Sequence, residues 1–186
     1  GLTQESMIRS VGWRFMDMGK RIERALQTIA TVKGLLTPVS GEIEQSTLLT
    51  AMLTSMEALI TYRRRGRERR GIELGLELVL LDHSNPRSLL FQLERLQEHL
   101  LELPKSDPAA GELDEEARAL LEATTALKLT RLPHLLQSTG NTRPEMATLM
   151  TQLAGLLREF SRFISDKHFD HRTSPHQLFS TIRGGR

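Results

Sequence analysis

Apolar residues in the first part of the chain recur every three or four positions, which is the spacing of one face of an α-helix. The series continues through about four heptads, so it predicts a long helix over about residues 3–36. Thr37-Pro38 follows directly, and proline cannot continue a helix. The apolar face consists of Ile8, Val11, Phe15, Met18, Ile22, Ala25, Ile29, Val32 and Leu36.

Similar patterns predict five further helices. The helix that follows residues 82–84 has Asn85 at the N-cap and Pro86 at the first helical position, both of which are favoured there. Pattern and length together predict one all-α domain, a single bundle of about six helices over residues 1–186 with a weakly ordered tail at 171–186. The first of these five helices is expected to begin near 41–46 and to end at 62–65. The other four are expected to cover about 72–82, 85–103, 114–132 and 144–168.

Composition supports the all-helical prediction and narrows the function. Aromatic residues make up only 4% of the chain, and leucine, glutamate, arginine and alanine outnumber β-branched residues, a balance that favours helix over sheet. No apolar run has the roughly 18 residues of a membrane span, and no signal-peptide core is present, so we expect a cytoplasmic protein. The absence of cysteine excludes disulfides and thiolate chemistry, and the six scattered histidines predict no metal site.

A carboxylate interrupts a second apolar stripe on the first helix. Apolar stripes on two sides predict that neighbours cover much of this helix, with a close approach at Gly19 and with Glu23 buried and held by an arginine or tyrosine. The residues leave two alternatives open for Glu23. It could bind a ligand or act as a general base, or it could simply be exposed to solvent. The stripe consists of Met16, Gly19, Glu23, Leu26 and Ala30.

A third stripe of the same helix is charged, with Arg14, Asp17, Arg21 and Arg24 at helical spacing. These side chains can pair along the helix for a few tenths of a kcal/mol each. Three arginines around one aspartate also leave excess positive charge. That charge could bind carboxylates or phosphates bidentately.

The segment "TYRRRGRERR" is strongly basic, with six arginines against one glutamate. Three interpretations remain open: a nucleic-acid patch, a solvated helix end whose arginines complement the helix dipole, and a site for a small anion or a partner. Tyr62 is the only aromatic residue nearby, and the net charge of the whole chain is only +2, which argues against nucleic acid. Helical spacing predicts that Arg64 turns inward while Arg65 and Arg67 remain exposed.

Three segments resemble the bacterial alpha-E domain family: "GWRFMDMGKRIERALQT", "MEALITYRRR" and "LLDHSNPRSLLFQLERLQEHLLELP". The resemblance implies an all-helical domain found with circularly permuted ATP-grasp ligases, which form amide bonds. It also implies that the chain corresponds to the C-terminal portion of a longer, duplicated pattern. The positions that match the family's motifs are Arg14, Asp17, Gly19, Arg21, Glu23, Arg24, Tyr62, Arg63, Arg64, Asn85, Arg87 and Ser88.

These observations lead to one hypothesis with two alternatives. We expect an accessory domain that binds a peptide or a partner for an ATP-grasp ligase, with Glu23 receiving an ammonium group and Arg14, Arg21, Arg24 and Arg64 receiving carboxylates. ATP and Mg²⁺ would then belong to the ligase and not to this chain, and neither nucleic acid nor a membrane is expected as a partner. The alternatives are an enzyme with Glu23 as general base and Tyr62 as proton donor, and a structural scaffold.

Overall fold

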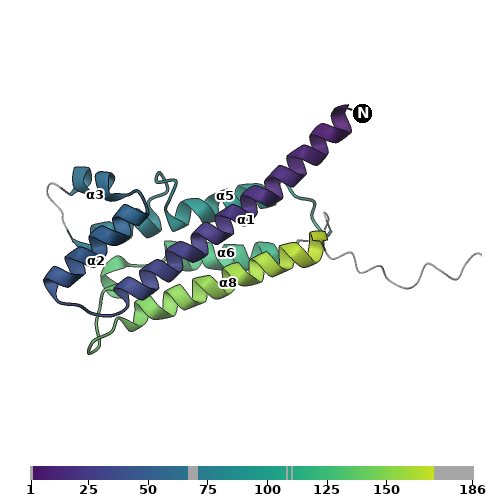
Figure 1. Ribbon diagram of the computed structural model, residues 1–186. Helices are drawn as coiled ribbons and strands as arrows, with labels where there is room; N and C mark the ends of the chain where they lie inside the picture. Colours follow the sequence, from purple (N-terminus) through teal and green to yellow (C-terminus); the bar gives the residue numbers. More distant parts are fainter. Residues whose placement is uncertain (1, 67–70, 108, 110, 170–186) are drawn as a thin grey trace, which may run out of the picture.

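The computed structural model describes residues 2–66, 71–107, 109 and 111–169, and side chains from residue 11 onward (Figure 1). All regular elements within these ranges are helical, which confirms the all-α prediction. The expected weakly ordered tail lies outside the described residues, as do Arg67, Arg69 and Arg70. None of the helices in the described ranges has the length and apolar character that a membrane span requires.

Eight α-helices and one turn of π-helix make up the described fold. The count exceeds the predicted six for two reasons. The helices predicted over residues 41–65 and 72–82 are each divided into two elements, and a short additional helix precedes the last one. The elements are α1 (Leu2–Leu36), α2 (Glu42–Ser55), α3 (Leu59–Arg65), α4 (Ile72–Leu76), the π-helix η1 (Glu77–Leu81), α5 (Leu89–Leu101), α6 (Glu115–Lys128), α7 (Leu132–Leu135) and α8 (Pro144–Phe169).

Four helices form the centre of the core, and buried residues of α2, α4, η1 and α7 extend it. α1 packs against α5 and α8, and α6 packs against the same two helices, while α2 packs against α1 and α3 packs against α2 (Figure 1). The predicted apolar face of α1 is buried without a miss from Met18 to Leu36. The N-terminal end of α1 extends beyond the other helices, so Val11, on the same face, is 46% exposed.

The helix predicted over residues 41–65 is broken after Ser55. Glu57 has a left-handed backbone with φ of 54°, and the amides of Glu57 and Ala58 donate to the carbonyls of Thr54 and Leu53 at 3.1 and 2.8 Å. These two bonds form a Schellman motif, which usually has glycine at the left-handed position. The sequence did not indicate this helix end because glutamate occupies that position.

Ser88, and not Asn85, caps α5. The Ser88 hydroxyl accepts a hydrogen bond from the Phe91 amide at 3.1 Å. Asn85 instead stabilises the preceding loop, because its amide donates to the Leu78 carbonyl at 2.9 Å and its Oδ1 accepts from the Arg87 amide at 3.1 Å. The predicted cap was therefore wrong by three residues, and Pro86 precedes the helix.

A buried arginine just before α8 ties the start of that helix to the C-terminal end of α1. Arg143 is 6% exposed and precedes α8, and its guanidinium donates to the carbonyls of Leu36 and Pro38 at 2.8 and 3.2 Å and to Gln45 Oε1 at 2.7 Å. Burial lowers the pKa of Arg143 below its ordinary value. The carbonyls at the end of α1 lack intrahelical donors, so Arg143 satisfies groups that would otherwise be unpaired.

Candidate functional site

Three members of the charged stripe of α1, all except Arg24, form a polar network with α5. Asp17 Oδ2 accepts hydrogen bonds from Arg21 Nε at 2.8 Å and from His99 Nε2 at 2.6 Å. Arg14 donates to His99 Nδ1 at 3.0 Å, and Arg21 also donates to Gln92 Oε1 at 3.1 Å. We call these five residues the Asp17 network.

The hydrogen bonds of the network select one tautomer of His99 and shift the pKa of Asp17. An arginine can only donate, so Nδ1 of His99 is the acceptor and Nε2 carries the proton that is donated to Asp17. Burial alone would raise the pKa of Asp17, but the hydrogen bonds from His99 and Arg21 and the positive charge of Arg21 outweigh it and lower that pKa below its ordinary value. Both ring nitrogens of His99 are engaged, so this histidine has no free nitrogen for acid–base chemistry.

Three of the four charged residues in the stripe therefore have partners within the fold. The predicted pairing of Asp17 with Arg21 along α1 is confirmed. The two partners on α5, Gln92 and His99, were missed. Both lie within the apolar stripe of a helix, at 0% and 7% exposure, and a polar residue in such a stripe is the signal that could have indicated them.

Glu23 lies on the exposed side of α1, which corrects the prediction that it is buried. Met16 is 56% exposed, and nothing lies within 4 Å of the position where Gly19 would carry a Cβ. Most of the second stripe thus faces solvent, although Leu26 is partly buried against the core, and no neighbour approaches Gly19. Among the described residues, neither Glu23 nor Arg24 has a hydrogen bond or ion pair.

Arg24 lines a small polar pocket where α1, the end of α2 and the start of α5 meet. The pocket has a volume of about 170 Å³, and Arg87, from another part of the chain, also lines it. We call it the Arg24–Arg87 pocket. Its lining residues are Arg24, Gln27, Thr28, Thr31, Ser55, Met56 and Arg87.

Arg87 is held at this pocket by Glu57, the residue with the left-handed backbone. The distance from Arg87 Nη2 to Glu57 Oε2 is 2.8 Å, and the two side chains are 39% and 67% exposed. Such an exposed pair contributes little to stability. A left-handed backbone at a residue other than glycine, asparagine or aspartate is uncommon, and such residues are often found at functional sites.

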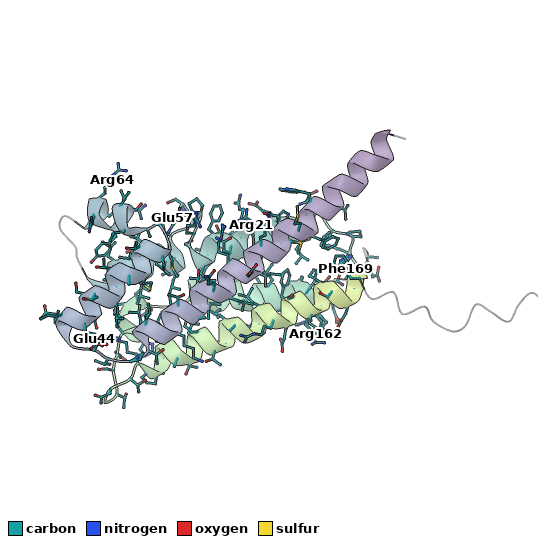
Figure 2. The ribbon with its side chains drawn as sticks, in the orientation of Figure 1. Arg21, Glu44, Glu57, Arg64, Arg162 and Phe169 are labelled. Atoms are coloured by element: carbon teal, nitrogen blue, oxygen red, sulfur yellow. The ribbon has the colours of Figure 1, made fainter. Side chains whose placement is uncertain are left out.

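The arginines after Tyr62 do not converge on these residues. Tyr62 lines a different pocket, between α2 and α3, and its hydroxyl accepts a hydrogen bond from the Gly71 amide at 2.9 Å. Arg63 is exposed beside it, and Arg64 points away from the bundle, which contradicts its predicted inward orientation (Figure 2). Arg65 is exposed as predicted and pairs with Asp82 at 2.8 Å.

A second charged cluster joins α8 to the start of α6. Lys167 donates to Asp114 at 2.6 Å and to Glu116, which is 5% exposed. Burial would lower the pKa of Lys167, but the two carboxylates raise it above its ordinary value. In the described ranges no three His, Asp or Glu side chains come together in a way that could hold a metal ion.

With this geometry in place, comparison with known proteins identifies the family. A family model described as "a predicted alpha-helical domain with a conserved ER motif" matches residues 1–169. The chain belongs to the Alpha-E family. It is also 35% identical over 160 residues to the uncharacterized proteins Mb2597 of Mycobacterium bovis and Rv2567 of Mycobacterium tuberculosis. The match covers 86% of this chain but 18% of each relative, and no solved structure matches.

Two Glu-Arg pairs lie in the described helices of this Alpha-E domain, and their surroundings differ. Glu94 and Arg95 on α5 are ion-paired, with Lys128 and Glu98 respectively. Glu23-Arg24 on α1 is the exposed pair, and it matches the pattern Gly-x-x-x-Glu-Arg. Only the α1 pair combines the family's motif with groups that remain available to a molecule outside the described chain.

Proposed function

We propose that this Alpha-E domain is a non-catalytic accessory domain that binds a peptide or partner for an ATP-grasp-type amide ligase. The single observation behind the proposal is the exposed, unpaired Glu23-Arg24 pair in a family described by its Glu-Arg motif. A motif that served only the fold would be expected to make contacts within the fold. Motif residues that face solvent are more often retained for binding or catalysis.

The choice of partner rests on the resemblance to the alpha-E family, which implies association with ATP-grasp ligases. The short coverage of the relatives is consistent with a domain that works beside others, because the matched segment is 18% of their length. In this account ATP and Mg²⁺ bind to the ligase. Glu23 receives an ammonium group or a basic side chain, and Arg24 receives a carboxylate.

Two observations argue against the general-base alternative for Glu23. A general base works best in a pocket that excludes water, and Glu23 is exposed. Tyr62, the expected proton donor, lines a pocket formed from α2, α3 and the residues after it, to which α1 contributes no residue. The geometry therefore favours binding over catalysis.

The test is a direct binding measurement with a purified, circularly permuted ATP-grasp ligase. The immobilised chain is compared with Glu23→Ala and Arg24→Ala variants by biolayer interferometry. Each variant should weaken binding by about tenfold or more, as expected for loss of a charged contact in an interface. Glu122→Ala and Arg118→Ala, which change exposed residues of the same types on α6, serve as matched controls.

Either of two results would overturn the proposal. One is equal affinity of the Glu23→Ala and control variants for the ligase. The other is no binding by the unmodified chain, whether or not short peptides are present. Circular dichroism of each variant separates loss of binding from loss of fold.

A further inference from the structure

Arg24 and Arg87 come from distant parts of the sequence and line one pocket. Arg24 lies on α1, and Arg87 lies in the loop before α5. Two arginines that line one small cavity, with Glu57 paired to only one of them, leave excess positive charge there that an anionic group can neutralise. Arginine is suited to that role because its planar fork matches a carboxylate or phosphate bidentately.

The hydrogen-bonding groups of the pocket point to the same kind of ligand. The hydroxyls of Thr31 and Ser55 already donate to the carbonyls of Gln27 and Met52, at 2.9 and 2.8 Å. Thr28 is 4% exposed, and its hydroxyl has no partner within the described residues. The donors left for a ligand are thus the Thr28 hydroxyl, the Gln27 amide and the two guanidinium groups.

Glu57 already places a carboxylate on one of these guanidinium groups. Its contact with Arg87 is 2.8 Å long, and Glu57 has an uncommon left-handed backbone. The contact shows how a carboxylate binds at the edge of this pocket. A ligand carboxylate would compete with Glu57 for Arg87 and would gain Arg24 in addition.

From these contacts we infer that the Arg24–Arg87 pocket binds the carboxylate of an acidic peptide, with Glu57 as the intramolecular competitor. The pocket's volume of about 170 Å³ suits one acidic group and not a whole peptide. Glu23 lies one helical turn before Gln27 on α1, beside the pocket, where a peptide ammonium group can approach it. The inference rests on the proposed function and specifies the ligand class that Arg24 recognises.

The test is an NMR titration of the ¹⁵N-labelled chain with the dipeptide glycyl-L-glutamate. Glycyl-L-glutaminamide, in which both carboxylates are replaced by amides, is the matched control ligand. We expect saturable shifts at Arg24, Thr28 and Arg87 with the acidic dipeptide only. Arg24→Gln and Arg87→Gln should each weaken binding about tenfold or more. Arg158→Gln, at an exposed position on α8, should leave it unchanged.

The Glu57→Gln variant tests the competitor directly. It removes the competing charge but keeps the length of the side chain, so the dipeptide should bind several-fold more tightly. Equal or weaker binding to this variant, or shifts that the neutral dipeptide reproduces, would overturn the inference. Saturable binding of inorganic phosphate at the same residues without binding of the acidic dipeptide would overturn the carboxylate assignment.

The two proposals fail in different ways. If the ligase binds and Glu23→Ala weakens it, but the dipeptide does not bind, then only the pocket assignment is wrong. If the dipeptide binds as expected but the ligase does not, the accessory role is wrong and the pocket remains. The well-dispersed amide spectrum of each variant verifies its fold in both cases.

Discussion

Two sets of charged residues on α1 have the same chemistry and opposite surroundings. Asp17 and Arg21 are bound to His99 and Gln92 on α5, with every distance between 2.6 and 3.1 Å. Glu23 and Arg24, two and three residues after Arg21, are exposed and have no partner among the described residues. A rotation of about 100° per residue turns Glu23 to another side of α1. Arg24 lies on the same side as Asp17 but two turns further along α1, where it lines the Arg24–Arg87 pocket and has no partner on α5.

The comparison indicates how to separate structural from binding residues in this fold. The Asp17 network satisfies its own hydrogen bonds, so its residues stabilise the packing of α1 on α5. The Glu23-Arg24 pair contributes nothing comparable to the fold. Four substitutions, taken from the largest expected effect on stability to the smallest, test this division.

The largest effect is expected for Asp17→Ala. The substitution leaves His99, which is 7% exposed, and Arg21 without their shared acceptor, so we expect the free energy of unfolding to fall by about 2 kcal/mol. Urea denaturation followed by circular dichroism measures the change, with Glu122→Ala as a control on an exposed helix face. A loss no greater than that of the control would show that the network is not structural.

The second effect is a pH dependence of the Asp17 contribution. The pKa of Asp17 is lowered in the folded state, so its carboxylate form stabilises the fold at pH values above its unfolded pKa near 3.8. That contribution is lost as the pH falls through 3.8 toward the folded-state pKa. The difference in unfolding free energy between the unmodified chain and Asp17→Asn should therefore be larger at pH 7 than at pH 3. A difference that grows on acidification would contradict the sign of the shift.

The sequence alone predicted the helices well and the site only in part. The apolar residues of α1 that recur at helical spacing between Met18 and Leu36 are buried, because a helix face that packs against the core must be apolar at that spacing. Periodicity cannot indicate whether any neighbouring helix covers a second stripe. Glu23 was therefore predicted to be buried, although it is exposed to solvent. The Schellman end at Glu57 also lacks its usual glycine, and the pocket beside it joins residues about 60 positions apart, from Arg24 to Arg87.

The third effect has the opposite sign and concerns Gly19. No atom lies within 4 Å of a Cβ built there, and alanine is the better helix former, so Gly19→Ala should raise the free energy of unfolding by up to about 1 kcal/mol. Gly75→Ala is the contrasting variant, because its Cβ would lie 2.5 Å from Leu49 Cδ1 and no gain is expected. Destabilisation by Gly19→Ala would mean that a neighbour does cover this face of α1.

The smallest effect on stability tests the central claim most directly. We would measure the free energy of unfolding of the Glu23→Ala/Arg24→Ala double variant by urea denaturation, beside the Arg118→Ala/Glu122→Ala control on α6. Exposed, unpaired residues predict a change within about 0.5 kcal/mol for both proteins. A loss of about 2 kcal/mol or more in the first variant alone would show that the pair is part of the fold, and would contradict its assignment as a binding surface.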